Sequence, residues 1–187
     1  MENGFSGVQY RSNAQTRCLH WPLSFIALLL LTALAMMTSI AKADELHLLI
    51  NGKAIHLDAQ PDTSYNESNW GAGLQYDFGA KDDNWVPFAT ASGFIDSNKN
   101  PSYYAGGGLM RRYTTGHGDA RVHYDLGIVA FVMIREGFKN DKPFLGALPA
   151  FSVGTDKIAL NMTYIPRVDP KSVPLVFFQL KIRLNSF

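Results

Sequence analysis

The feature that most constrains the fold is an alternation of apolar and polar side chains along the chain. From Val122 to Val132 the even positions are apolar, whereas the odd positions include His123, Asp125 and Gly127. Residues 70–78 repeat the pattern, with Trp, Ala, Leu, Tyr and Phe on one face and Gly, Gln and Asp on the other. Successive side chains of a strand point to opposite faces, so this period predicts β-strands with one apolar face.

Eight stretches of about ten residues show this pattern. They lie at about 45–57, 70–78, 85–95, 103–113, 121–133, 144–152, 157–165 and 174–185. An even number of antiparallel strands can close into a barrel, which removes the sheet edges that lipid does not tolerate. A polar interior with lipid outside suits the alternation. The sequence therefore predicts an all-β fold, an eight-stranded antiparallel transmembrane β-barrel.

A soluble eight-stranded barrel or sandwich with a lipocalin-like interior is the alternative. A mean hydropathy close to zero does not separate the two, because half of each strand in a membrane barrel is polar. Aromatic residues near the strand ends favour the membrane, since barrels carry aromatic girdles at both interfaces. These residues are Trp70, Tyr76, Trp85, Tyr113, Tyr124 and Tyr164. The terminal Phe187 is typical of outer-membrane barrels, but it lies on the wrong face of its strand unless a bulge intervenes.

An export signal is predicted ahead of the barrel. Residues 21–40 form an apolar run, preceded by Arg11 and Arg17 and followed by the small-x-small triplet 41–43. This is the pattern of a cleaved signal peptide at 1–43, with a membrane anchor as the alternative, and it leaves 44–187 as the barrel. The 144 remaining residues carry 14 basic and 15 acidic side chains, so no basic stripe for nucleic acid is expected. The single cysteine, Cys18, is lost with the signal.

Three residues suited to acyl chemistry are expected at one end of this barrel. If the N-terminus is periplasmic, the loops at about 57–69, 96–102, 134–143 and 166–173 share the outer rim. His56 precedes the first of these loops, and Asp96 and Ser97 open the second. A hydroxyl needs a base to become a nucleophile, and an imidazole base needs an orienting partner. The alternative is that Asp96-Ser97 is a turn-opening pair and His56 a surface residue.

Several short motifs resemble one family of membrane enzymes. Tyr65–Gly73 resembles the Y-N-E-x-x-W-G-x-G run of the lipid A palmitoyltransferases, the PagP family, and Asp96-Ser97 resembles their catalytic Asp-Ser pair. Further segments are similar to the family's L-P-x-x-S-V-G and M-T-Y-I-P motifs. They are Leu148-Pro149, Ser152-Val153-Gly154 and Met162-Thr163-Tyr164-Ile165-Pro166. The likeness covers about residues 65–187.

The resemblance implies an outer-membrane enzyme that takes a palmitate-like acyl chain from a phospholipid and transfers it to lipid A at the outer leaflet. It implies His56 as the general base, Asp96 as its orienting partner and Ser97 as a nucleophile or positioning hydroxyl. The motif residues Tyr65, Asn66 and Glu67 are then expected to contact substrate. No cofactor is implied, and we expect a monomer. A lipid A deacylase or phospholipase and a non-enzymatic small barrel are the alternatives.

Two prolines and a glycine are further candidates for substrate contact. Proline lacks the N–H group that a β-ladder needs, so Pro149 and Pro166, on neighbouring predicted strands, indicate a local break in pairing. The family is thought to admit lipid at such a place. Gly108 lies in the Gly106–Gly108 run of the fourth strand and matches the family's acyl-chain ruler at the cavity floor. The alternatives are a bulge without lipid traffic and a glycine that serves barrel curvature.

The first strand departs from the family pattern. The family's amphipathic helix before this strand is predicted to be absent. His56 shares the parity of the apolar Leu46, Leu48 and Ile50, so it faces lipid unless Asn51-Gly52 forms a bulge. Asn-Gly is also a hairpin signal, and His47 is the alternative base. Asn69 stands where the family has a proline, and no cluster has the spacing of metal ligands.

Overall fold

The computed structural model describes residues 44–58, 64–79, 84–167 and 172–186. The predicted signal peptide, the question of a helix before the first strand, and Phe187 lie outside these residues. The strands are β1 (Glu45–His56), β2 (Ser68–Asp77), β3 (Trp85–Ile95), β4 (Pro101–Thr115), β5 (Val122–Arg135), β6 (Phe144–Gly154), β7 (Ile158–Ile165) and β8 (Leu175–Ser186). Two short 3-10 turns, Gly118–Ala120 and Lys139–Asp141, follow β4 and β5.

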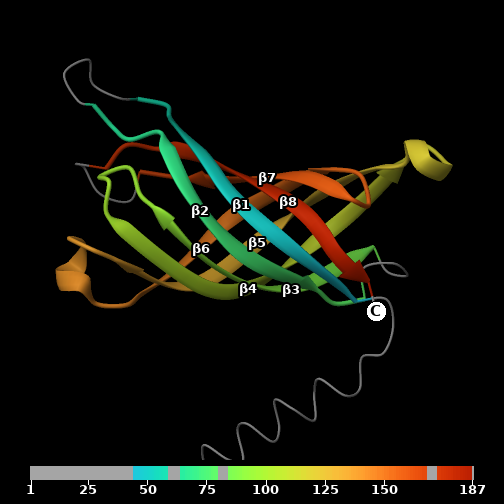
Figure 1. Cartoon of the computed structure of the whole chain (residues 1–187), viewed down its shortest axis with the longest axis horizontal. Helices are drawn as coiled ribbons and strands as arrows, with labels where there is room; N and C mark the ends of the chain where they lie inside the picture. Colours follow the sequence, from blue (N-terminus) through green and yellow to red (C-terminus); the bar gives the residue numbers. More distant parts are fainter. Residues whose placement is uncertain (1–43, 59–63, 80–83, 168–171, 187) are drawn as a thin grey trace, which may run out of the picture. The chain divides into compact units, whose positions relative to one another are not determined.

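The eight strands form one closed antiparallel barrel (Figure 1). Each strand pairs with its neighbour in sequence, and β8 pairs with β1 to close the sheet. β1, β3, β5 and β7 end at the left in Figure 1, where the described residues that follow them lie, and β2, β4, β6 and β8 end at the right. The predicted barrel is confirmed. No helix in the described part of the chain is long and apolar enough to cross a membrane.

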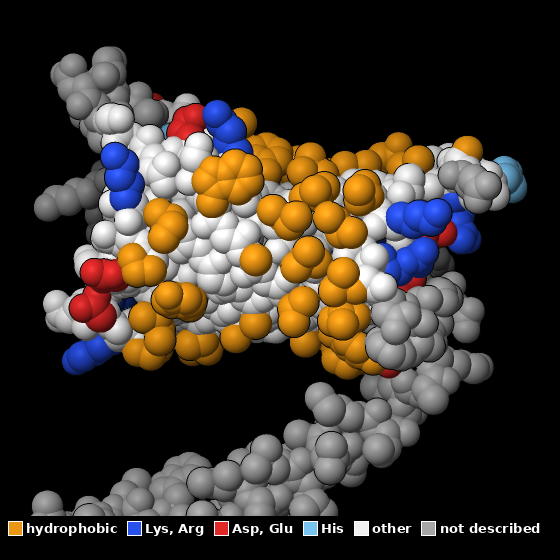
Figure 2. All heavy atoms as spheres, viewed as in Figure 1, with side chains coloured by type: hydrophobic (Ala, Val, Ile, Leu, Met, Phe, Trp, Pro, Cys, Tyr) orange, Lys and Arg blue, Asp and Glu red, His pale blue; other side chains and the backbone are white. Residues whose placement is uncertain are grey.

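The outer wall is apolar. Alternate residues of each strand expose large hydrophobic side chains, such as Trp70, Leu126 and Leu145. Figure 2 shows these side chains along the wall of one face, with Lys, Arg, Asp and Glu gathered at the two ends. The inward residues are largely polar, and the buried ones include Asn51, Gln75, Ser152 and Gln179. This arrangement is that of barrels that span a membrane, with lipid outside and a polar interior.

A bulge at Asn51-Gly52 determines which way the end of β1 faces. The register of β1 shifts between Asn51 and Lys53 against β2, and between Asn51 and Ala54 against β8. One extra residue exchanges the two faces, so the buried positions are odd up to Asn51 and even from Ala54. His56 therefore lies on the inward parity. The hairpin alternative is wrong, because β1 pairs with β8 on both sides of the bulge.

The barrel is weakest between β6 and β7. This ladder holds five residue pairs, from Ala150 opposite Thr163 to Gly154 opposite Ala159, whereas β5 pairs with β6 from residue 123 to residue 133. Among the described residues, Phe144–Pro149 has no partner in β7. Proline cannot donate to a ladder, so Pro149 stands where pairing stops. The predicted break in pairing is present at the outer half of this seam.

Candidate active site

The predicted catalytic residues lie at one end of the barrel. His56 is the last residue of β1, and Asp96 and Ser97 begin the turn between β3 and β4. Both segments belong to the end that carries the loops (Figure 1). The loop ahead of β2 brings Tyr65, Asn66 and Glu67 to the same end. His56 and Ser97 are 41 residues apart in sequence and meet here because β1 and β3 run in the same direction around the barrel.

The His56 ring is held by an aromatic stack. It lies nearly parallel to the Tyr65 ring, with 4.4 Å between the ring centroids and an angle of 15° between the planes. Its Nδ1 atom is buried and has no hydrogen-bond partner within the described residues. A buried imidazole nitrogen without a partner is costly unless a ligand completes it. The ring is thus oriented by packing, and its Nδ1 has no hydrogen-bond partner among the described residues.

Asn66 links this stack to the Asp96-Ser97 turn. Its backbone N–H donates to the carbonyl of Ser97 at 2.9 Å. Its side-chain Nδ2 donates to the carbonyl of Asp96 at 3.0 Å and to that of Ser68 at 3.1 Å. Because Tyr65 and Asn66 are consecutive, His56 and Ser97 belong to one connected cluster. The structure brings together five of the predicted residues in this way, with Asn66 at the centre.

Glu67 lies on the other side of the same loop. Its carbonyl accepts the N–H of Ala54 at 2.9 Å, beside the β1 bulge. Its carboxylate lies 3.2 Å from the ammonium of Lys53, and both side chains are exposed. An exposed pair of this kind contributes little to stability. Glu67 therefore fixes the loop mainly through its backbone, on the outward side of the cluster.

The Asp96 carboxylate is buried and fully engaged. Its Oδ1 accepts the backbone N–H groups of Asn98 at 2.8 Å and Asn100 at 3.0 Å. Its Oδ2 accepts from Nε and Nη2 of Arg135 at 2.9 and 2.7 Å, and the Ser102 hydroxyl lies 3.4 Å away. Two amides and a guanidinium compensate the burial of one charge. Asp96 thus holds the turn that carries Ser97 and joins that turn to β5.

The expected contact between Asp96 and His56 is not among the hydrogen bonds of the described residues. The sequence analysis did not identify Arg135, which occupies the oxygen that such a contact needs. The signal that identifies Arg135 is parity, because odd residues of β5 such as Asp125 face inward. A cation at the end of that row faces the rim. In this arrangement the Asp96 carboxylate accepts hydrogen bonds from Arg135 and from the turn that carries Ser97.

Gly108 faces the lumen, but a phenyl ring covers it. A Cβ atom at this position would lie 2.1 Å from the carbonyl oxygen of Ile128 in β5 and 2.6 Å from Cζ of Phe88, the residue opposite Gly108 in the β3–β4 ladder. Phe88, Met110 and Ala150 form a buried apolar cluster inside the barrel. The absence of a side chain at Gly108 makes room for this ring. Phe88 is therefore the bulky side chain at the level of Gly108 in the lumen. Sequence reasoning could have identified it only from the strand register that pairs Phe88 with Gly108.

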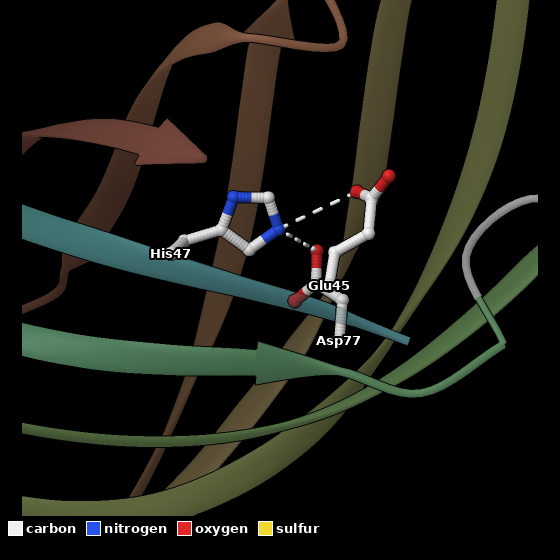
Figure 3. A group of neighbouring side chains, drawn as sticks. All are labelled: Glu45, His47 and Asp77. Atoms are coloured by element: carbon white, nitrogen blue, oxygen red, sulfur yellow. Dashed lines mark ion pairs between the residues drawn. The ribbon is translucent and has the colours of Figure 1, made fainter. Parts of the chain in front are cut away.

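A second cluster of titratable side chains occupies the opposite end of the lumen (Figure 3). His47 points its Nε2 toward two carboxylates, with 3.2 Å to Asp77 and 3.5 Å to Glu45. The strand spacing of Glu45 and His47 places both on the inward face, a signal that the search for metal-ligand spacing missed. Lys181 lies 3.2 Å from Asp77, and Arg183 lies 2.8 Å from Glu45.

The charges at this end are balanced without a metal ion. The two carboxylates of the cluster already face two cations, so a divalent ion would add uncompensated charge. A cavity of about 10 Å³ beside His47 has room for about one water molecule. We read the cluster as an ion-pair network that joins β8 to β1 and β2 across the closing seam. His47 lies in this network, at the end of β1 away from Ser97.

A smaller network joins the inner turns. The imidazole of His123 hydrogen-bonds the Asp156 carboxylate through Nε2 and lies 3.0 Å from the Thr114 hydroxyl through Nδ1. Arg121 also donates to Asp156, at 2.9 Å. Partial burial alone would raise the pKa of the Asp156 carboxyl. The hydrogen bonds from His123 and Arg121 lower this pKa by more than burial raises it, so the pKa lies below its ordinary value. These hydrogen bonds connect the β4–β5 turn to Asp156 in the β6–β7 turn.

Curated relatives include lipid A acyltransferase PagP from Bordetella pertussis strain Tohama I and from Bordetella bronchiseptica strain RB50. Each is 32% identical over 103 residues, 55% of this chain and 54% of the relative. The chain thus spans about half the length of the curated relatives it matches.

Two solved structures resemble this chain weakly. Neisserial surface protein A is 10% identical, with a TM-score of 0.46 over 75% of this chain and 95% of that one. Ail of Yersinia pestis is 11% identical, with a TM-score of 0.43 over 78% and 99%. At this level neither likeness carries an argument. A sequence model described as "antimicrobial peptide resistance and lipid A acylation protein PagP" matches residues 37–180. The chain belongs to the PagP family.

Proposed function

We propose that this protein is an outer-membrane acyltransferase that moves an acyl chain from a phospholipid to lipid A at the outer leaflet. The observation that carries the proposal is the cluster in which Asn66 joins the His56–Tyr65 stack to the Asp96-Ser97 turn. The family and the names of its Bordetella relatives supply the acceptor class. Export through a cleaved signal peptide would deliver the barrel to that membrane.

His56 acts as the general base. It removes the proton of the attacking hydroxyl, and the hydroxyl oxygen bonds to the ester carbonyl of the donor. Collapse of the tetrahedral intermediate breaks the ester bond, and the leaving glycerol oxygen takes the proton back from His56. The products are an acylated lipid A and a lysophospholipid. The attacking hydroxyl belongs either directly to lipid A, with Ser97 as its hydrogen-bond partner, or to Ser97. In the second case a hydroxyl of lipid A then attacks the acyl-Ser97 ester, His56 takes its proton, and the ester bond to Ser97 breaks as the Ser97 oxygen takes that proton back.

Asp96 fixes the position of Ser97. The turn that begins at Asp96 is tied by two backbone amides and by Arg135, so the hydroxyl of Ser97 is carried on a rigid segment. A reacting group held within a fraction of an ångström of its place contributes strongly to rate. Asp96 is therefore a positioning residue for Ser97, and its negative charge is paired with the guanidinium of Arg135.

The donor chain enters through the seam between β6 and β7. Phe144–Pro149 pairs with β5 but has no partner in β7, so the outer half of that seam lacks ladder hydrogen bonds, and Pro166 follows the end of β7. The acyl chain then lies in the lumen below the rim. Phe88, which covers Gly108, limits how deep the chain can reach. The length of the transferred chain follows from the position of that ring.

Purified protein refolded into vesicles tests the proposal. The vesicles contain lipid A and a phospholipid with a labelled acyl chain, and the label on lipid A is measured. His56→Ala and Ser97→Ala should reduce transfer by at least about a hundredfold, the scale of losing a base or a nucleophile. Thr114→Ala and His117→Ala change the same types of residue at the opposite end and should transfer normally.

Three other outcomes would contradict the transferase. Release of labelled fatty acid without transfer would identify a phospholipase, and loss of chains from lipid A a deacylase. No change in either lipid would favour a structural barrel. Transfer that survives both His56→Ala and Ser97→Ala would show that the reaction takes place elsewhere.

A further inference from the structure

The cations of the outer rim fall into two groups. Six lysine and arginine residues lie at this end among the described residues, and three of them pair with carboxylates. Lys53 lies 3.2 Å from Glu67, Arg135 2.7 Å from Asp96, and Arg167 2.5 Å from Asp58. The other three are Lys99, Lys139 and Lys142, which are exposed and have no carboxylate within ion-pair distance in the described part of the chain.

The three lysines without partners share one sector of the rim. Lys99 lies in the β3–β4 turn that carries Ser97, and the other two lie in the β5–β6 loop. The N–H of Glu136 donates to the carbonyl of Pro101 at 3.3 Å, and Nδ2 of Asn100 donates to the carbonyl of Glu136 at 3.1 Å. The turn and the loop therefore form one surface next to the candidate active site.

Lys139 is held in place by the loop. Its ammonium lies 5.8 Å from the centroid of the Phe138 ring and 5.1 Å from that of Phe144, within the range of cation–π contact. The two rings pack edge to face, with 5.2 Å between their centroids. A lysine restrained in this way loses less side-chain entropy when it binds an anion.

The backbone of this loop is also unusual. Lys139, Asn140 and Asp141 have positive φ angles of 51°, 57° and 59°. Such angles are uncommon for residues other than glycine, and a run of three costs free energy. Strained segments persist where the surroundings determine them, and they are frequent at ligand clamps. The Asp141 carboxylate is occupied within the loop, where it accepts the N–H of Gly137 at 2.7 Å.

We propose that Lys99, Lys139 and Lys142 bind a phosphate group of a lipid substrate beside Ser97. The acidic groups of this surface are Glu136, Asp141 and Asp96, and the charge of Asp96 is balanced by Arg135, so the three lysines leave the surface net positive. The inference rests on the proposed function, in which two phosphate-bearing lipids meet at this rim. Lipid A carries phosphates on its glucosamine units, and the donor carries one in its headgroup. A phosphate held here would place the sugar of the acceptor, or the glycerol of the donor, over the Asp96-Ser97 turn.

Equilibrium binding to the refolded barrel tests this without relying on catalysis. Lys139→Gln/Lys142→Gln removes two of the three lysines. Lys53→Gln/Arg167→Gln is the matched control, because it removes two rim cations that already have partners. Three lipids are compared: bisphosphorylated lipid A, the same lipid after phosphatase treatment, and the donor phospholipid. A lysine near a lipid phosphate contributes about fivefold to affinity.

The expected result is a loss of at least about tenfold for the Lys139/Lys142 variant with phosphorylated lipid A, and none with the dephosphorylated lipid. The control should change by less than about twofold. A loss confined to the donor phospholipid would assign the phosphate to its headgroup. Equal losses in both variants, or none in either, would overturn the proposal. If the wild-type protein transfers no acyl chain, the proposed function fails while this binding result still decides the inference.

Discussion

The pair of Asp96 and Arg135 gives the sharpest test of how the candidate site is built. If Asp96 acts through Arg135 to hold the turn of Ser97, the two side chains should behave as one unit. Asp96→Asn keeps the shape of the side chain and removes its charge. Arg135→Met keeps much of the stem of Arg135 and removes the guanidinium. The double variant completes a thermodynamic cycle.

The magnitudes follow from burial. The Asp96 side chain is 4% exposed and that of Arg135 27% exposed. Breaking a fully buried pair costs about 3–5 kcal/mol, because one charge is left without compensation. Since Arg135 reaches solvent, we expect Asp96→Asn to cost about 2–3 kcal/mol and Arg135→Met about 1–2 kcal/mol. The double variant should cost little more than the worse single variant, which gives a coupling energy of about 1–2 kcal/mol.

Urea unfolding of the refolded barrel, followed by tryptophan fluorescence, gives the stabilities, and acyl transfer gives the rates. Arg135→Met should slow transfer about as much as Asp96→Asn, because both release the same turn. Stability losses that add within about 0.5 kcal/mol would refute the pairing. A normal rate for Arg135→Met beside an inactive Asp96→Asn would show instead that Asp96 acts directly on His56.

Three further perturbations test other parts of the structure. Phe88→Ala should lengthen the transferred acyl chain, measured by mass spectrometry of the product, and should lower the free energy of unfolding by about 3 kcal/mol, measured by urea unfolding. An unchanged chain length would show that Phe88 does not limit the acyl chain, and would leave Gly108 as the candidate. Deletion of Gly52 removes the extra residue and restores plain alternation between Asn51 and His56, so His56 should stay inward, and the variant should resist heat-induced mobility shifts on gels and still transfer acyl chains; a folded deletion variant that no longer transfers would contradict the bulge argument. The pKa of Asp156 in the fold lies below its unfolded value, so its contribution to stability is present at neutral pH and is lost as the pH falls through the folded value. In the Asp156→Asn variant the free energy of unfolding should therefore depend less on pH below about pH 4. An unchanged pH dependence would show that the hydrogen bonds of Asp156 with His123 and Arg121 do not stabilise the fold.

The barrel could be predicted from sequence because its rule is local. Each strand must present one apolar face to lipid, so the alternation seen at Val122–Val132 is repeated around the sheet. Even the bulge at Asn51-Gly52 could be anticipated, since only an extra residue reconciles an inward His56 with the outward Leu46, Leu48 and Ile50. The structure contains that register shift. A second register shift lies between Arg183 and Asn185 in β8. The sequence also predicted a bulge near the end of this strand, because Phe187 does not share the parity of the strand's apolar face.

The contacts inside the site could be predicted only in part. Motif resemblance placed His56, Tyr65, Asn66, Asp96 and Ser97 together, but it did not give the partners of Asp96. Arg135 is 39 residues away from Asp96, and although the parity of β5 places it on the inward face, its pairing with this carboxylate depends on contacts between strands that a local pattern does not give.

Two further contacts depend on strand register, which the alternation of side chains does not determine. Phe88 faces Gly108 because of the pairing of β3 with β4. Glu45 and Asp77 meet at His47 because of the pairing of β1 with β2. Strand positions can be read from a local pattern, whereas contacts between strands require the register itself.

Mass spectrometry of lipid A from cells that express the full-length protein tests the central claim most directly. The comparison uses wild-type protein, His56→Ala and Ser97→Ala, with His117→Ala as the matched control at the opposite end. We predict that lipid A gains the mass of one acyl chain with the wild type and the control, and that it is unchanged with the other two variants. Lipid A that keeps its mass in the wild type, although the barrel is folded in the outer membrane, would contradict the account.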